Sequence, residues 1–375
     1  MTETVKRLKK IITCLLLAVM IALPATEALA QSRRASDKPK YVTLMFTGDL
    51  MCDGRFQESL YDSKRGTYDF DSVLRLVKPL FRDADYVAGN LETCVSSGYS
   101  LGKTRKRIDG KPYHNSPASF LKALKKAGID GLIMANNHNL DTGKTGVWRT
   151  IKAVEKKGFD HTGLYRKSSD DHYFMIRKNG IRIAVLAYAK YYNERDKKLS
   201  SKDISRMLSS YSQGKVRREV RTARASGADF VIAYIHMGNE NTYEISDKQK
   251  ETMKELADAG VDYIIGSHPH VLQQKGSVRS GGRTVPCVYS LGNFTGYLRR
   301  DMTRETAILK VRLKKTKSGK TSAVKSTYIP CYMAEGFEGE KLTLVPSTYK
   351  GGEARDRKDL YSHYYHIRKI INNKL

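Results

Sequence analysis

Five short apolar runs in this chain each end in polar side chains of the kinds that bind metal ions. The runs and the residues after them are Tyr41–Phe46 before Gly48-Asp49, Tyr86–Ala88 before Gly89-Asn90-Leu91-Glu92, Gly131–Ala135 before Asn136-Asn137-His138, Phe230–Ile235 before His236-Met237-Gly238-Asn239-Glu240, and Val261–Ile265 before Gly266-Ser267-His268-Pro269-His270. Such runs are typical of buried strands, and open α/β sheets build their sites at the carboxyl ends of strands. The pattern predicts one site assembled from several strand ends.

The segments between these runs carry helical patterns. The expected helices are Asp71–Phe81, Pro117–Ala127, Gly146–Lys157, Val216–Ala225 and Ser246–Ala259. In the last, Met253, Leu256 and Ala257 share one face at helical spacing, and Gly260 follows as a stop signal. Strands that alternate with helices predict an α/β fold with a largely parallel sheet and covering helices.

Hairpins are also expected. Lys178-Asn179-Gly180 is a typical turn between the runs Tyr173–Arg177 and Ile181–Tyr188. A second β-rich zone follows the last polar cluster, and Lys314–Lys320 forms its basic hairpin tip. Its strands are expected at Val285–Tyr289, Glu305–Leu313 and Ala323–Pro330.

Residues 1–30 have the pattern of a signal peptide. Four basic residues at 6, 7, 9 and 10 precede the apolar run Ile11–Leu23, and Ala28-Leu29-Ala30 forms a small-x-small cleavage site. An uncleaved membrane anchor is the alternative, although 13 residues are short for a membrane span. Either outcome predicts an exported body outside the cytoplasm, secreted or membrane-associated, after a polar linker at 31–40.

The chain is strongly basic. Its formal charge of +28 becomes +26 without residues 1–30, which hold four basic and two acidic residues. Such a charge attracts polyanions and anionic membrane surfaces, and an exported chain meets envelope polymers and lipid headgroups rather than nucleic acid. The alternative is that the charge only keeps the protein soluble or near an anionic envelope.

Two basic insertions interrupt the site segments, at Ser97–Asn115 and Tyr191–Lys215. Loops at this edge of a sheet commonly set substrate specificity, and a solvated charged surface is the alternative. Four cysteines follow the signal segment, and an oxidising compartment permits disulfides between them. Cys52 and Cys94 each lie just beyond a site strand, so one pairing joins them and leaves Cys287 with Cys331; four free, partly buried thiols are the alternative.

Six of the strand-end residues form a set of the metal-ligand type. They are Asp49, Glu92, Asn137, His236, His268 and His270. Two carboxylates, an amide oxygen and three imidazoles suit divalent Mn, Fe, Zn or Mg, and a shared carboxylate can hold two ions. Taken singly, Asp49 could be a turn residue and Asn137 a helix cap, but six such residues at successive strand ends favour a metal site.

In this order the motifs resemble the CapA family of bacterial capsule, or poly-γ-glutamate, synthesis proteins, which is related in fold to calcineurin-like metallophosphatases. The resemblance runs from about Tyr41 to Phe294. It rests on Gly48-Asp49, Asn90-Leu91-Glu92, Ala135-Asn136-Asn137-His138 with Asp141, His236-Met237-Gly238-Asn239-Glu240, Gly266-Ser267-His268-Pro269-His270-Val271-Leu272-Gln273 and Tyr289-Ser290-Leu291-Gly292-Asn293-Phe294. The fold that it implies is an α/β metallophosphatase-like β-sandwich flanked by helices, in α-β-β-α layers.

The resemblance also implies roles for the site residues. Asp49 and His270 would hold a first metal, Glu92 would bridge, and the second metal would lie on Asn137, His236 and His268. His138 resembles the phosphatase histidine that stabilises the transferring group, with Asp141 as its orienting partner. Glu240, which closes its motif, is a third candidate catalytic residue.

Two departures from the metallophosphatase pattern bear on activity. Met51 stands two residues after the first aspartate, where metallophosphatases have histidine, and a thioether is a soft ligand for hard divalent ions. Glu92 stands where they have aspartate. The first metal position could therefore be weak, empty or differently built.

The sequence predicts an exported protein for biosynthesis, export or attachment of an anionic capsule polymer, poly-γ-glutamate, with membrane ligase and export subunits as further partners. One alternative is a metal-dependent phosphoesterase or amide hydrolase of the envelope; another is a non-catalytic polymer-binding or scaffold component. Whether the chain is an enzyme stays open. The expected domain covers 41–340, followed by a C-terminal tail at 341–375.

Overall fold

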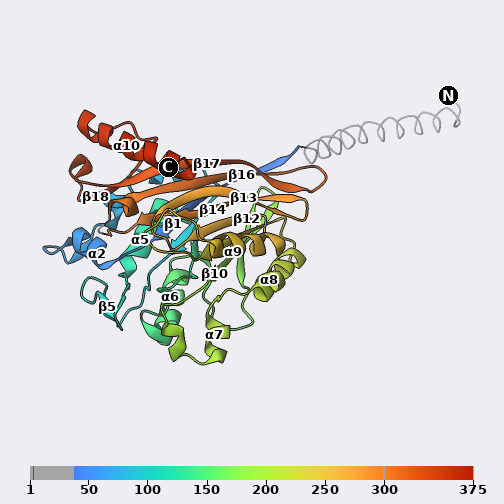
Figure 1. Ribbon diagram of the computed structural model, residues 1–375, viewed down its shortest axis with the longest axis horizontal. Coiled ribbons are helices and arrows are strands. Elements are labelled where there is room, and N and C mark those ends of the chain that lie inside the picture. The colour runs from blue at the N-terminus through green and yellow to red at the C-terminus, as the bar shows by residue number, and fades with distance from the viewer. Residues whose placement is uncertain (1–2, 4–37, 299, 375) are drawn as a thin grey trace.

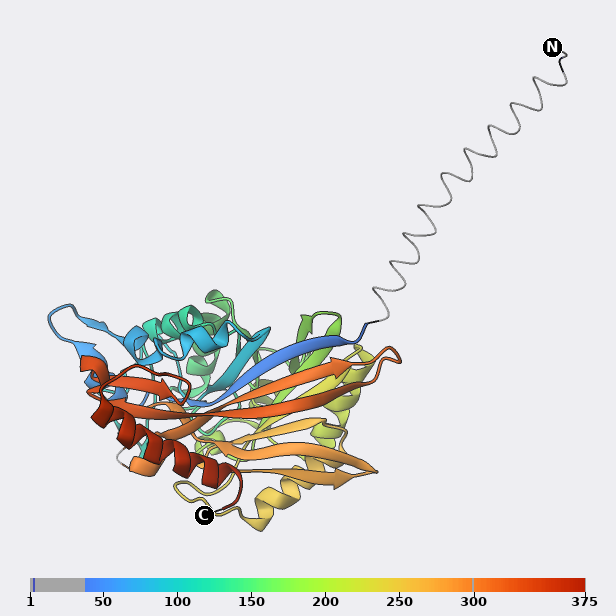
Figure 2. The same ribbon diagram turned by 90° about the horizontal axis from the view of Figure 1, so that it is seen from above.

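Two β-sheets stacked face to face form the centre of the molecule (Figures 1 and 2). The computed structural model describes residue 3, residues 38–298 and residues 300–374, so the predicted signal segment and most of the linker lie outside the described residues. The first sheet has eight strands in the order β18-β17-β16-β1-β4-β7-β8, with β15 beside β1. The second has six, in the order β13-β14-β12-β11-β10-β9.

Most strands follow the predicted apolar runs, but the four at 160–162, 272–280, 293–295 and 342–346 match none of them. The first sheet contains β1 (Lys40–Leu50), β4 (Tyr86–Leu91), β7 (Gly131–Ile133), β8 (Asp160–Thr162), β15 (Asn293–Thr295), β16 (Glu305–Lys315), β17 (Thr321–Glu335) and β18 (Leu342–Pro346). The second contains β9 (Tyr173–Lys178), β10 (Ile181–Ala189), β11 (Phe230–His236), β12 (Tyr263–Ser267), β13 (Leu272–Ser280) and β14 (Arg283–Leu291). Two small hairpins lie outside the sheets, β2 (Tyr61–Asp62) with β3 (Thr67–Tyr68) and β5 (Arg107–Ile108) with β6 (Lys111–Pro112).

Each sheet combines a block of parallel strands with antiparallel strands; in the first sheet the antiparallel strands lie on one side only, and β8 forms a parallel edge on the other. Strands β1, β4, β7 and β8 run parallel, as do β10, β11 and β12, whereas β16–β18, β9 and β13 pair antiparallel to their neighbours. The expected parallel sheet is thus present twice, with hairpins added at its edges. The predicted turn between β9 and β10 is confirmed, and Asn179 and Gly180 both adopt the positive φ, 50° and 71°, that this tight turn requires.

Helices flank both sheets. The longer ones are α5 (Ala118–Ala127), α6 (Gly143–Lys156), α8 (Gln213–Ala225), α9 (Asp247–Asp258) and α10 (Ala354–Ile371). The shorter ones are α2 (Gly54–Leu60), α3 (Phe70–Leu74), α4 (Lys78–Phe81) and α7 (Ser201–Met207), with 3-10 turns at Arg195–Lys198, Asp301–Arg304 and Phe337–Gly339. None of the helices in the described part of the chain is long and apolar enough to cross a membrane.

One predicted helix is wrong in its extent. The segment Asp71–Phe81 forms two short helices, α3 and α4, instead of one. Pro79 lies in the first turn of α4, where its missing N–H is tolerated. If α3 continued through this position, Pro79 would lie inside the helix and could not donate the backbone hydrogen bond that the helix needs there.

The core shows why the strands take this arrangement. Along β10, Ile183 and Val185 face the interior that the two sheets share, whereas Leu186 and Tyr188 face the layer of α8 and α9. Phe46 of β1 meets Tyr234 of β11 edge to face across the sandwich, with ring centroids 6.0 Å apart. The predicted fold class, two sheets between helical layers, is confirmed.

Candidate metal centre

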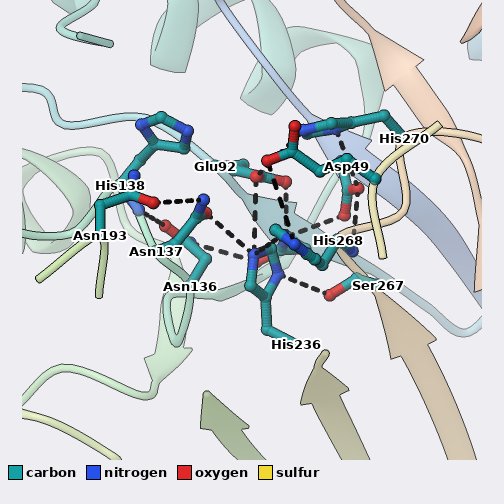
Figure 3. Close-up of polar contacts among 12 residues, drawn as sticks. Asp49, Glu92, Asn136, Asn137, His138, Asn193, His236, Ser267, His268 and His270 are labelled. Atoms are coloured by element: carbon teal, nitrogen blue, oxygen red, sulfur yellow. Dashed lines mark hydrogen bonds and ion pairs between the residues drawn. The ribbon is translucent and has the colours of Figure 1, made fainter. Parts of the chain in front are cut away.

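The carboxyl ends of the parallel strands converge on one cluster of polar side chains (Figure 3). Asp49 lies near the end of β1 and Glu92 directly follows β4. The loop after β7 supplies Asn137, β11 ends at His236, and the loop after β12 carries His268 and His270; these six residues are buried. Since both sheets direct their parallel strands toward this edge, residues far apart in the sequence come together here.

Two ligand groups within this cluster share one carboxylate. Ligand atoms of Glu92, His236 and His268 lie within 4.8 Å of one another, and so do those of Asp49, Glu92 and His270. Glu92 Oε1 lies 3.6 Å from His236 Nε2 and 4.0 Å from His270 Nε2. Glu92 therefore stands between the two groups, as a bridging ligand must.

Asn137 completes the first of these groups. Its Oδ1 lies 3.0 Å from His236 Nε2, which in turn lies 3.1 Å from His268 Nδ1. His236 Nδ1 contacts Ser267 Oγ at 3.0 Å, so Nε2 is the nitrogen directed at Asn137 and His268. The other group is looser, because His270 Nδ1 lies 3.9 Å from Asp49 Oδ2 and is held by Asn293 Oδ1 at 3.0 Å.

The loop that carries the two histidines has an unusual backbone. His268 and His270 adopt φ values of 100° and 60°, in a region that costs a non-glycine residue about 1–3 kcal/mol. The strand before it approaches β14 so closely that a Cβ on Gly266 would lie 2.0 Å from the carbonyl oxygen of Tyr289. The sheet thus holds the loop in a conformation that aims both rings into the cluster.

The electrostatics of the cluster fit a divalent cation. Burial raises the pKa of Asp49, and burial together with the nearby Asp49 carboxylate raises the pKa of Glu92 well above its usual value. Burial lowers the pKa of His236 and His268 well below 6.5, which keeps both rings neutral and able to act as ligands. Within the described part of the chain, no residue forms a hydrogen bond with the buried Oε1 of Glu92. A cation among neutral imidazoles would compensate both carboxylates and occupy this oxygen.

A second set of buried side chains adjoins the ligand groups. His138 Nδ1 lies 2.8 Å from Asp141 Oδ2, which also accepts the backbone N–H of His114 at 2.6 Å. The guanidinium of Arg195 pairs with the other oxygen of Asp141. Burial raises the pKa of Asp141 to about 7, and Arg195 opposes that rise. The His114 and His138 rings lie 4.0 Å apart between centroids.

His114 and Arg195 are site residues that sequence reasoning missed. Both lie inside the basic insertions, where no periodic pattern marks individual residues. Arg195 also donates to the carbonyl oxygens of Ile108 and Pro112, at 3.3 and 3.0 Å, and so joins the two insertions beside the site. The only available signal was that both insertions lie between site segments.

The positive charges of the insertions have local partners. Lys106 pairs with Glu58 at 2.7 Å and Lys198 pairs with Asp109. Lys103 Nζ lies 3.1 Å from the centre of the Tyr61 ring. These contacts order the loops and reduce the charge that they present to a distant polyanion.

Two further predicted residues have distinct positions. Glu240 is exposed, and its Oε1 lies 4.0 Å from His268 Nε2, at the rim of the cluster. Met51 is buried beside Gly296, and its carbonyl oxygen accepts a hydrogen bond from Thr295 Oγ1 at 2.8 Å.

The proposed disulfides are absent from the structure. Cys52, Cys94, Cys287 and Cys331 are free and buried. Cys94 Sγ contacts the carbonyl oxygen of His138 at 3.2 Å, and Cys52 packs in the main hydrophobic core. Burial raises the pKa of Cys94 and of Cys287 to about 12, so these thiols stay protonated. Cys52 and Cys94 each lie just beyond a site strand, but their side chains enter separate environments and do not form a disulfide.

Comparisons with known proteins agree with this architecture. Residues 43–297 match the model of a family described as bacterial capsule synthesis protein PGA_cap. Capsule biosynthesis protein CapA of Bacillus anthracis is 28% identical over 310 residues, 81% of this chain and 72% of that protein. PGA biosynthesis protein CapA of Bacillus subtilis (strain 168) is 31% identical over 281 residues, 73% of this chain and 68% of that protein. The NAD nucleotidase NadN of Haemophilus influenzae shares the fold, with a TM-score of 0.50 and 12% identity over 88% of this chain and 61% of that one.

Proposed function

The chain belongs to the bacterial capsule synthesis protein PGA_cap family. From this premise we propose that it is an exported protein and that it acts on an anionic capsule polymer through a two-metal centre. The polymer that we propose is poly-γ-glutamate, because relatives named for capsule and PGA biosynthesis cover most of the chain. Its repeated carboxylates suit a protein with a formal charge of +28.

The observation that carries the metal proposal is the position of Glu92. One buried carboxylate shared by two groups of ligand residues is the arrangement that a pair of divalent ions requires. Asn137, His236 and His268 would hold one ion and Asp49 with His270 the other. Mn, Fe, Zn and Mg are the candidates, since the donors are oxygen and imidazole nitrogen.

A divalent ion in this place would supply Lewis acidity toward a phosphoryl or amide oxygen. The protein contributes the neighbouring histidine. The hydrogen bond from His138 Nδ1 to Asp141 leaves Nε2 as the nitrogen available to a substrate. We propose that His138 orients the reacting group and exchanges a proton with it, while Asp141 and Arg195 fix the ring.

Met51 supports a second candidate, a polymer-binding or scaffold component without catalysis. It stands where the metallophosphatase pattern has histidine, and the Asp49 and His270 side of the centre shows the longer separations. A centre with only one well-formed metal position could stabilise the site and bind polymer without catalysing a reaction.

A complementation experiment separates these two candidates. A capsule-forming strain that lacks the chain would receive the wild type, a Glu92→Gln variant, or a Glu251→Gln variant as a matched control on the exposed face of α9. Poly-γ-glutamate at the cell surface and chain abundance would be measured together. Loss of polymer with Glu92→Gln alone, at normal abundance, supports the metal-dependent role. Full polymer from a Glu92→Gln chain that binds no metal would overturn it.

A further inference from the structure

The C-terminal helix α10 contacts strands of both sheets, β13 of the second and β16 and β17 of the first (Figure 1). Its buried residues share one hydrophobic cluster with Leu272 of β13 and with Ala307 of β16. Tyr364 of α10 also donates its hydroxyl to the carbonyl oxygen of Val345 in β18, at 3.0 Å. The helix therefore fastens the two sheets to each other along this side of the molecule.

Two histidines of α10 hold a buried carboxylate. Glu305, the first residue of β16, accepts one hydrogen bond on each oxygen, from His363 Nδ1 at 2.9 Å and from His366 Nδ1 at 2.7 Å. Its side chain is only 5% exposed. Tyr332, opposite Glu305 on β17, stacks on the His363 ring with centroids 3.7 Å apart. A carboxylate in such a place is stable only while it keeps its donors.

The chain next to Glu305 supports one of the candidate metal ligands. The carbonyl oxygen of Thr303, two residues before Glu305, accepts a hydrogen bond from Asn293 Nδ2 at 3.4 Å. Asn293 Oδ1 lies 3.0 Å from His270 Nδ1. The orientation of the His270 ring thus depends on a side chain that is itself held from the start of β16.

A second candidate ligand depends on the same region. Gly292, the single residue between β14 and β15, adopts a φ of 70°, and its carbonyl oxygen accepts the backbone N–H of Asp49 at 2.9 Å. Gly292 is packed so closely that a Cβ there would lie 2.7 Å from the carbonyl oxygen of Glu305. A displacement of Glu305 would therefore reach both members of the looser ligand group, Asp49 and His270.

The tighter ligand group is held by other residues. Within the described part of the chain, the side-chain hydrogen bonds of Asn137 and His236 join them to each other and to Asn193, Ser267 and His268. These partners lie neither on α10 nor within residues 303–306. A change at the α10 histidines should leave this group in place.

We propose that His363 and His366 are positioning residues for the metal centre. By holding Glu305, they keep Asp49 and His270 at the spacing that a second ion needs. Without these two donors the Glu305 carboxylate would be buried and unsatisfied, so it would turn toward water and displace the start of β16. The consequence for metal binding rests on the proposed function, but the link from α10 to the centre can be measured without any ion.

Hydrogen exchange of the metal-free protein tests this link. The double variant His363→Leu with His366→Leu removes both donors, and leucine forms helices better than histidine, so α10 itself is not weakened. We expect a peptide that covers 291–295 to exchange about tenfold faster, and a peptide over 230–236 to stay unchanged. Each single replacement should give an intermediate effect, which also serves if the double variant does not fold. Unchanged exchange at 291–295 would overturn the proposal.

Two further variants separate positioning from general packing. Tyr361→Leu with Tyr365→Leu is the matched control, since these side chains are 56% and 65% exposed on the same helix. We expect it to exchange as the unaltered protein does. His363→Asn with His366→Asn keeps a side-chain N–H near each Nδ1 position and should restore most of the protection. Equal loosening in the tyrosine and histidine variants would contradict a positioning role.

Metal titration measures the consequence at the centre. In the double leucine variant we expect the position formed by Asp49 and His270 to lose about tenfold or more in affinity, because groups that orient metal ligands typically contribute 10- to 100-fold. The other position should keep its affinity, and equal weakening of both would overturn the proposal. If the unaltered protein binds no ion, the proposed function fails, while the exchange at 291–295 still decides whether the α10 histidines hold this segment.

Discussion

The two groups of ligand residues that share Glu92 differ in how closely they are assembled. On the tight side, Asn137 Oδ1 and His268 Nδ1 lie 3.0 and 3.1 Å from His236 Nε2. On the loose side, the nitrogens of His270 lie 3.9 Å from Asp49 and 4.0 Å from Glu92. We infer that the same strand-end arrangement produces one preassembled position and one that needs adjustment, so the two positions should fill in order.

Glu92→Gln should have the largest effect on metal binding, because both positions share this carboxylate. It removes the charge that both positions share but keeps the shape of the side chain, so we expect the chain to lose both ions. Elemental analysis of protein purified without chelators would measure this, with about one to two ions expected for the wild type. Added Mn²⁺ or Zn²⁺ should raise the Tm of the wild type and not of the variant. An unchanged ion content in Glu92→Gln would place the metal elsewhere.

Replacing one histidine on each side should separate the two positions. We expect His236→Ala to remove the tightly held ion and His270→Ala to remove the weaker one. Titration of metal-free protein would show a single remaining class of site in each variant, of lower affinity in His236→Ala. If both variants keep the same affinity, the two sides are equivalent and the comparison is wrong. Changing His268 and His270 together to alanine should leave neither site.

Much of this centre could be predicted because strand ends are visible in a sequence. Apolar runs locate the strands, parallel pairing brings their carboxyl ends together, and Asp49, Glu92, Asn137, His236, His268 and His270 follow from those two steps. The division into two metal positions came from the resemblance and stays a prediction; the structure shows that Glu92 lies within reach of both groups of ligand-type residues.

Other features leave no periodic signal. His114 and Arg195 reach the site from loops whose course depends on their mutual contacts. The left-handed backbone of His268 and His270 is imposed by the surrounding sheet. The break between α3 and α4 at Pro79 could have been predicted, because a proline inside a helical pattern ends or kinks it.

Met51→His should strengthen the loose side. An imidazole is a better ligand than a thioether for Mn, Fe or Zn, so we expect the weaker position to gain roughly tenfold or more in affinity. Met175→His, at a half-buried position of β9 in the second sheet, is the matched control. No change in stoichiometry or affinity with Met51→His would mean that the side chain of Met51 points away from the centre and that its correspondence to the phosphatase histidine is wrong.

The smallest effect should come from the residue that orients Asn137. Asn193 Oδ1 accepts from Asn137 Nδ2 at 3.2 Å, which turns the Asn137 carbonyl oxygen toward His236. Groups that orient a metal ligand typically contribute 10- to 100-fold to affinity, and since Asn137 can still reach its place without Asn193, we expect Asn193→Ala to weaken the tight position by about tenfold. The loose position should not change, because neither Asp49 nor His270 contacts this pair among the hydrogen bonds of the described residues. Equal weakening of both positions in a competition titration would show that the two sides are coupled. The metal affinity of one position would then not be independent of the other, whatever the difference in their geometry.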